Sequence, residues 1–211
     1  MENNLIAQSG TALKDAAYAL VLIHGRGASA DGILTLASHF NLQNTAILAP
    51  QAPFGSWYPQ SFMAPVASNQ PDLDQALQTI DQLVGEIKAA GIDNRHIAFC
   101  GFSQGACLAL EYTTRHADRY AGIVAFTGGL IGREIEIANY QGDFKQTPVL
   151  LTTSNPDHHV PFQRVQESAR ILEDMHAKVE LKAFPGKPHN ITPQEISLAN
   201  QKVFDSLIKK Q

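Results

Sequence analysis

Apolar stretches of strand length alternate with stretches of helical periodicity along most of the chain. Residues 17–23 form a continuous apolar run that ends at His24-Gly25, a pattern typical of a strand that is buried on both faces. Further runs predict strands at residues 45–49, 97–100, 122–126, 148–153 and 179–184. Pro50 ends the second strand, because proline has no N–H group to donate to a sheet.

The stretches between these runs have the pattern of amphipathic helices. In residues 73–90, leucine, isoleucine and valine recur at spacings of three and four, which predicts a helix with one apolar face that ends at Gly91. Helices are also expected at residues 30–39, 104–115, 162–176 and 193–209. Alternation of strand and helix is typical of the α/β class, so we expect a mainly parallel central sheet with helices on both faces.

Two connections, residues 50–72 and 127–147, are too long to be tight turns. Long loops in a compact α/β domain are usually functional. Binding sites of open parallel sheets lie beyond the carboxyl ends of the strands. We therefore expect both connections to be parts of a binding site, with the reactive groups just after the strands.

Composition and charge narrow the class of protein. The chain has 211 residues (22.9 kDa), which is the length of one domain, so we expect a single domain of residues 1–211. Its content of 44% hydrophobic and 17% charged residues is typical of a globular fold. A net charge of −4 without a basic run argues against nucleic acid or an anionic membrane as main partner. No apolar run approaches the ~20 residues of a membrane span, and Met1 to Asn4 lack the features of a secretory signal. We expect a soluble, cytoplasmic protein without membrane insertion.

A candidate nucleophile follows the strand at residues 97–100. The sequence Gly101-Phe102-Ser103-Gln104-Gly105 is a G-x-S-x-G elbow, and it stands between a predicted strand and a predicted helix, as that motif requires. The two glycines lack the side chains that would collide with neighbouring elements in so tight a turn. Ser103 is therefore the predicted nucleophile, although a serine and glycine loop that merely caps a helix remains the plain alternative.

A serine nucleophile needs a base and an acid, which follow it in the chain order serine, acid, histidine in this architecture. Four aspartates lie between Ser103 and the last histidine: Asp118, Asp143, Asp157 and Asp174. Only Asp157 comes immediately after a strand, where its alternative role is to cap the next helix. His189 follows the last strand, and a pKa near neutrality suits histidine to take and return a proton. We predict Asp157 as the orienting acid and His189 as the base.

The turn His24-Gly25-Arg26-Gly27 is the candidate for the second half of an oxyanion hole, because it follows an early strand. The N–H groups of Arg26 and Gln104 would stabilise the oxyanion. The Arg26 side chain remains free either to attract an anionic substrate or to pair with Asp31. His24 is expected to form hydrogen bonds within its loop. A metal site made by His24 with the histidines beside Asp157, His158 and His159, lacks metal-ligand spacing, so no metal is expected.

These motifs together resemble the phospholipase/carboxylesterase branch of the α/β hydrolases, which includes the acyl-protein thioesterases. The resemblance runs through nearly the whole chain and rests on the segments His24-Gly25-x-Gly27, Ala52-Pro53 to Trp57, Gly101 to Gly105, Asp157-x-x-Val160-Pro161 and Gly186-x-x-His189. It implies an α/β-hydrolase fold without a large cap domain. It also implies a serine esterase that needs no cofactor, with Gln104 and residue 26 supplying the oxyanion hole.

The sequence therefore predicts a serine hydrolase of carboxylic esters or thioesters that acts through an acyl-enzyme. Its partner would be a small-molecule ester or thioester; a homodimer is compatible with the sequence but not indicated by it. Trp57, Phe62, Met63 and Leu130 are candidates for an apolar wall around the acyl group, with ordinary loop packing as the alternative. A catalytically idle binder of the same fold has no need for all three triad residues. A dienelactone-type hydrolase would prefer cysteine as the nucleophile.

Overall fold

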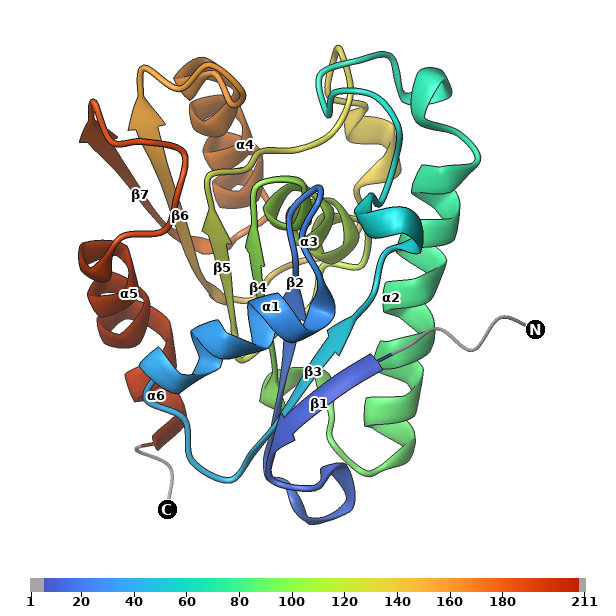
Figure 1. Ribbon diagram of the computed structural model, residues 1–211, viewed down its shortest axis with the longest axis vertical. Helices are drawn as coiled ribbons and strands as arrows, with labels where there is room; N and C mark the ends of the chain where they lie inside the picture. Colours follow the sequence, from blue (N-terminus) through green and yellow to red (C-terminus); the bar gives the residue numbers. More distant parts are fainter. Residues whose placement is uncertain (1–5, 209–211) are drawn as a thin grey trace.

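A seven-stranded sheet forms the centre of the protein, whose computed structural model describes residues 6–208 (Figure 1). Across the sheet the strands are β1 (Ile6–Gly10), β3 (Thr45–Pro50), β2 (Tyr18–Ile23), β4 (Ile97–Phe102), β5 (Gly122–Phe126), β6 (Pro148–Asn155) and β7 (Lys178–Pro185). The edge strand β1 is antiparallel to β3, and all other neighbours are parallel. The predicted mainly parallel sheet is confirmed.

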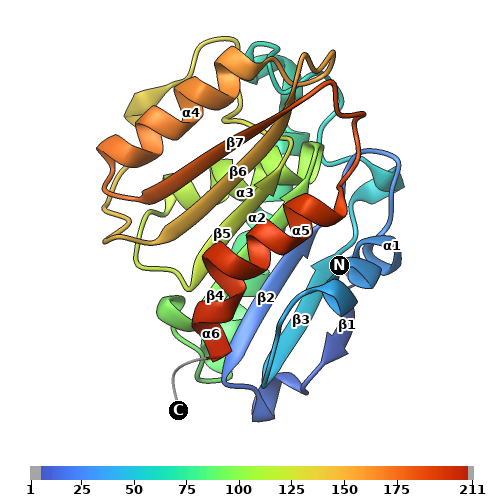
Figure 2. The same ribbon diagram turned by 90° about the vertical axis from the view of Figure 1, so that its left-hand side faces the viewer.

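Helices cover both faces of the sheet (Figures 1 and 2). One face carries α2 (Asp72–Ala89), α3 (Gln104–Arg115) and α4 (Phe162–Asp174). The other carries α1 (Ala30–Leu34), α5 (Pro193–Ala199), a π-helical turn (Asn200–Phe204) and α6 (Asp205–Ile208). Each face has its own apolar core, because alternate residues of a strand point to opposite sides. In β2, for example, Val21 joins the core under α2 and α3, and Leu20 joins the core under α1 and α5.

The structure differs from the predicted elements at three places. Strand β1 has no apolar run, because it is an edge strand whose residues are half-buried or exposed, and the sequence pattern missed it. The helix expected at 30–39 is α1 followed by a 3₁₀ turn, Thr35–His39. The last helix, expected at 193–209, passes through the π-helical turn, and its residue 209 lies outside the described residues, as do Met1 to Asn4.

Between β3 and α2 and between β5 and β6, the helical segments of the two long connections within residues 6–208 are short 3₁₀ turns. These are Pro53–Gly55 and Val66–Asn69 in the first connection and Ile137–Asn139 in the second. Two further 3₁₀ turns, Leu13–Asp15 and Asn94–His96, precede β2 and β4. The connections thus build no large cap domain over the sheet. Among the described helices, none combines the length and the apolar character that crossing a membrane requires.

Candidate active site

The turn between β4 and α3 holds Ser103 in a strained backbone conformation. Its φ of 54° and ψ of −119° lie in the positive-φ half of the φ/ψ map, which residues with a side chain rarely adopt. A Cβ atom at Gly101 would collide with the carbonyl of Gly105, and one at Gly105 would collide with the carbonyl of Ile23 in β2. The two glycines of the elbow are therefore required by the close approach of strand, turn and helix, as the sequence predicted.

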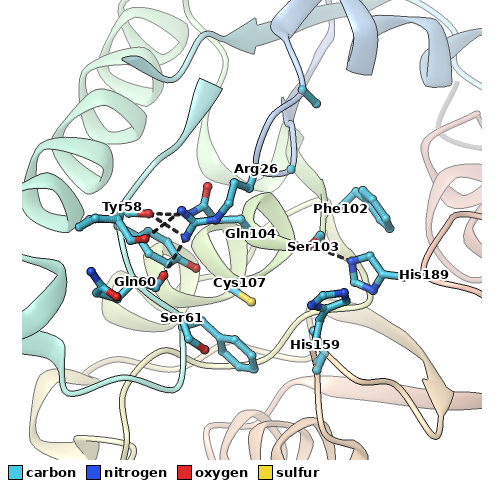
Figure 3. A pocket seen from close by; sticks show the side chains of 15 residues that line it. Arg26, Tyr58, Gln60, Ser61, Phe102, Ser103, Gln104, Cys107, His159 and His189 are labelled. Atoms are coloured by element: carbon cyan, nitrogen blue, oxygen red, sulfur yellow. Dashed lines mark hydrogen bonds between the residues drawn. The ribbon is translucent and has the colours of Figure 1, made fainter. Parts of the chain in front are cut away.

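Ser103, His189 and Asp157 form one continuous chain of hydrogen bonds. His189 Nε2 lies 2.9 Å from Ser103 Oγ, and His189 Nδ1 lies 2.9 Å from Asp157 Oδ2 (Figure 3). The three residues come from the ends of β4, β6 and β7, which meet at the same edge of the sheet because these strands are parallel. With the carboxylate as acceptor, Nδ1 carries the proton and Nε2 is free to accept one from the serine hydroxyl.

The Asp157 side chain is almost completely buried, with 2% of its surface exposed. Its Oδ1 accepts hydrogen bonds from the backbone N–H groups of His159 (2.8 Å) and Val160 (2.9 Å). Burial raises the pKa of Asp157, but the hydrogen bonds from His189, Val160 and His159 outweigh burial and leave the pKa below its usual range. The carboxylate is thus held ionised, with one oxygen fixed by the turn and the other facing the imidazole.

The turn after β2 lies beside Ser103. A Cβ atom at Gly25 would lie 3.4 Å from Ser103 Cβ, so a side chain at this position would crowd the nucleophile. The N–H groups of Arg26 and Gln104 form no backbone hydrogen bond within residues 6–208. His24 is buried beneath the turn, where Nδ1 donates to Gly25 O (2.8 Å) and Nε2 accepts from Ala52 N (3.1 Å). Burial lowers the pKa of His24, which suits this neutral, structural role.

The Arg26 guanidinium group does not pair with Asp31, so that alternative from the sequence is wrong. It donates instead to oxygen atoms of residues 56–60, in the first long connection. A five-residue spacing suggested a local ion pair, whereas the tertiary fold brings a distant loop against the turn. This contact is invisible in the sequence because it depends on the path of the loop.

A pocket of about 450 Å³ opens in front of Ser103. Its wall includes Arg26 and Gln104, five residues of the first long connection (Tyr58, Pro59, Gln60, Ser61 and Phe62), and the side chains of Phe102, Cys107, His159 and His189. The first long connection therefore contributes to the site, as expected. The second does not line the pocket; it lies behind the wall, where Gly132 N donates to Phe62 O (2.7 Å).

Of the four residues predicted to surround an acyl group, only Phe62 is among those that line this pocket. Trp57 is 2% exposed because its indole nitrogen donates to His24 O (2.8 Å), under the turn. Leu130 is completely buried in the core, and Met63 packs against that core from the loop. For these three, ordinary loop packing is the correct interpretation.

The sequence did not single out Tyr58, Cys107 and His159 as pocket residues. Cys107 lies in the first turn of α3, four residues after Ser103, and its N–H donates to Ser103 O (3.0 Å), so this spacing could have been a signal. His159 packs against the base, with 5.0 Å between the ring centroids of His159 and His189. Tyr58 had no signal, because its place depends on the loop. No group of three or more His, Cys, Asp or Glu side chains suited to a metal ion occurs in residues 6–208.

Both cysteines are buried as thiols, Cys100 in β4 and Cys107 in α3. Burial raises the pKa of Cys107 to about 12, and it also raises that of Cys100. Because the thiolate is the reactive form, we expect both to react slowly with a thiol reagent in the native protein and quickly after unfolding. Absorbance of the released thiol, followed over time at pH 8, checks this. Fast labelling of the native protein, or a Cys100–Cys107 disulfide, would contradict it.

A buried ion pair supports the loop that carries His189. Lys187 Nζ lies 3.4 Å from Glu195 Oε2, and the two side chains are 4% and 0% exposed. Glu195 also accepts hydrogen bonds from Thr152 Oγ1 in β6 (2.6 Å) and from Thr192 at the start of α5. Lys187 Nζ donates to Asn190 O as well. The pair thus ties the base-bearing loop to α5 and to the strand that precedes Asp157.

Replacing Glu195 with alanine should therefore lower the free energy of unfolding by about 3–5 kcal/mol, because Lys187 would keep a buried charge without its partner. Denaturant unfolding measures this change. The double variant Glu195→Ala/Lys187→Met should recover part of the loss, since it removes the orphaned charge. Glu180→Ala, which breaks the exposed pair between Glu180 and Lys202 (2.6 Å), is the matched control and should cost less than about 1 kcal/mol. Equal effects of Glu195→Ala and the control would refute the prediction.

Comparison with known proteins identifies a family and several similar proteins. The family model for phospholipase/carboxylesterase matches residues 8–204. A crystal structure of a phospholipase/carboxylesterase from Dyadobacter fermentans is 54% identical, covers 98% of this chain and 97% of its own, and superposes with a TM-score of 0.94. A probable carboxylesterase, SOBER1-like, from Arabidopsis thaliana is 27% identical over 194 residues, 84% of this chain and 74% of its own length. Acyl-protein thioesterase 1 of Cryptococcus neoformans is 23% identical, with 84% and 87% covered.

Proposed function

The chain belongs to the phospholipase/carboxylesterase family. We propose that it is a serine hydrolase that cleaves carboxylic ester or thioester bonds. The observation that carries the proposal is the chain of two 2.9 Å contacts from Asp157 through His189 to Ser103, at the wall of a pocket. One relative is named a carboxylesterase and another an acyl-protein thioesterase, which supports both an alcohol and a thiol as the leaving group. In both reactions the acyl group is transferred first to the enzyme and then to water.

In the proposed mechanism, Ser103 Oγ attacks the acyl carbon while His189 Nε2 takes the hydroxyl proton. Asp157 keeps the proton on Nδ1 and stabilises the imidazolium that forms. The tetrahedral intermediate collapses, the bond to the alcohol or thiol breaks, and His189 returns the proton to that leaving group. A water molecule, deprotonated by His189, then attacks the acyl-enzyme and releases the carboxylic acid and free Ser103.

The oxyanion of the intermediate would be stabilised by the N–H groups of Arg26 and Gln104. Both residues line the pocket together with Ser103, and among the described residues neither N–H group has a backbone partner, which supports this role. Gln104 is also the first residue of α3, so the positive end of the helix dipole faces the developing charge. A donor of this kind is typically worth about 10²–10³ in kcat.

The substrate would be a small-molecule ester or thioester whose acyl part lies against Phe62 and Cys107. A pocket of about 450 Å³ suits a ligand of modest size. The mechanism calls for no cofactor, and the whole chain is proposed to act as one domain. Turnover of an ester series with increasing acyl length, expressed as kcat/KM, would define the limit that the pocket sets.

Burst kinetics with a chromogenic short-chain ester test the proposal. We expect a rapid release of about one chromophore per active site, an intact-mass increase equal to the acyl group, and labelling of Ser103 by a fluorophosphonate probe. A protein of this fold that only binds a ligand would give neither burst nor label. Labelling at a residue other than Ser103 would refute the assignment of the nucleophile.

A further inference from the structure

The side chain of Arg26 binds a distant segment of the pocket wall, residues 56–60. Its Nη1 donates to Ser56 Oγ (3.1 Å) and Pro59 O (2.9 Å), and its Nη2 donates to Tyr58 O (2.9 Å) and Gln60 O (2.7 Å). Figure 3 shows dashed bonds that run from the Arg26 guanidinium group to the segment labelled Tyr58 and Gln60. All four acceptors are uncharged oxygen atoms, so the geometry of the planar group, rather than an ion pair, makes the contact.

Gln104 holds the same segment through both ends of its side-chain amide. Its Oε1 accepts from Trp57 N (2.9 Å), and its Nε2 donates to Tyr58 O (2.8 Å). The carbonyl of Tyr58 therefore accepts from both Arg26 and Gln104. The turn after β2 is joined to this segment by its backbone too, since Gly27 N donates to Gly55 O (2.8 Å). Side chains and backbone thus form one hydrogen-bonded unit between turn, loop and the start of α3.

We propose that Arg26 is a positioning residue whose guanidinium group clamps residues 56–60 and so fixes the pocket wall relative to the oxyanion hole. The inference rests on the proposed function, in which the N–H groups of Arg26 and Gln104 bind the oxyanion. The same two residues would then hold the wall with their side chains and the oxyanion with their backbones. A shift of the wall is transmitted to the backbone of residue 26 through the clamp.

Arginine suits this role better than any other side chain. Its guanidinium group is planar and presents its donors in a rigid fork, whereas lysine has one nitrogen whose three donors point away from a single atom. Lysine at position 26 would keep the charge but could not serve four acceptors spread over residues 56–60. Alanine would remove charge and donors together.

The clamp should matter more for turnover than for folding. Arg26 is exposed, so water can replace its hydrogen bonds when the side chain is removed. Water does not fix the position of the loop, however, and a displacement of about 1 Å can lower a rate about 100-fold. We expect Arg26→Ala to lower kcat at least about tenfold with little change in thermal stability.

The experiment compares Arg26→Ala, Arg26→Lys and the control Arg95→Ala, whose arginine pairs with Asp93 and does not line the pocket. We would measure kcat and KM for a neutral and an anionic ester of equal size, the affinity for a trifluoromethyl ketone that forms an oxyanion on the nucleophile, and the melting temperature. Both Arg26 variants should lose kcat on both esters, and affinity for the ketone should fall in parallel. Arg95→Ala should behave as the wild type.

Three results would overturn the clamp: wild-type kcat in Arg26→Ala, full kcat in Arg26→Lys, or unchanged affinity for the ketone. A loss confined to the anionic ester would also overturn it and would assign Arg26 to the recognition of substrate charge. Should Arg26→Ala fail to fold, Arg26→Lys decides the question by the same measurements. If wild-type protein shows no burst and no fluorophosphonate label, the proposed function fails; if it shows both and Arg26→Ala is unimpaired, only the clamp fails.

Discussion

Ser103→Ala is expected to abolish ester turnover and leave the fold intact. The alanine lacks the oxygen that would form the acyl-enzyme, and loss of the nucleophile in another serine hydrolase costs about 10⁶ in kcat. Within residues 6–208, the side-chain hydrogen bond that is lost is the one to His189, which keeps its contact with Asp157. The strained φ of 54° is already present with serine, so the substitution adds no backbone cost. We therefore expect a melting temperature close to that of the wild type.

Turnover of a chromogenic ester and labelling by a fluorophosphonate probe measure the effect together. Ser38→Ala is the matched control, because Ser38 is an exposed serine, outside the pocket, whose hydroxyl group donates to Thr35 O (2.8 Å). It should keep full activity and full labelling at Ser103. Activity that survives in highly purified Ser103→Ala protein would show that another group forms the covalent intermediate.

The central strands were predictable because burial on both faces leaves a continuous apolar run in the sequence. The run that became β2 is the clearest example, since each of its residues is buried in one of the two cores. Strand β1 has one neighbouring strand, β3, and its residues are half-buried or exposed. Its sequence therefore contains no continuous apolar run. Its presence follows from pairing with β3 rather than from its own side chains.

The three polar residues after β4, β6 and β7 were also predictable, because a parallel sheet brings the ends of its strands to one edge. The pocket wall was not. Trp57 and Tyr58 are neighbours in sequence, yet the indole of Trp57 donates to His24 O after β2, whereas Tyr58 lines the pocket. The backbone of this pair is held by distant residues: Arg26 donates to Tyr58 O, and Trp57 N donates to Gln104 Oε1. Residues fixed by such tertiary contacts leave no local pattern.

Asp157→Asn should lower turnover by about 10⁴, the loss known for the analogous change in another catalytic triad. The reason lies in the two oxygens of Asp157. Oδ1 accepts from the N–H groups of His159 and Val160, and in the variant the amide oxygen must keep that place. The amide nitrogen then faces His189 Nδ1 and donates to it. This forces the imidazole proton onto Nε2, which can no longer accept a proton from Ser103.

The chain offers a matched control in a second aspartate–histidine pair. Asp143 Oδ2 lies 2.9 Å from His176 Nδ1, but both side chains are exposed and neither lines the pocket. Asp143→Asn makes the same chemical change at the same distance and should leave kcat unaltered, whereas Asp157→Asn should be the severe variant with KM little changed. Steady-state kinetics of the two purified proteins decide between them. A severe Asp143→Asn variant, or an Asp157→Asn variant within tenfold of the wild type, would show that Asp157 does not hold the tautomer on which the proposed proton transfer depends.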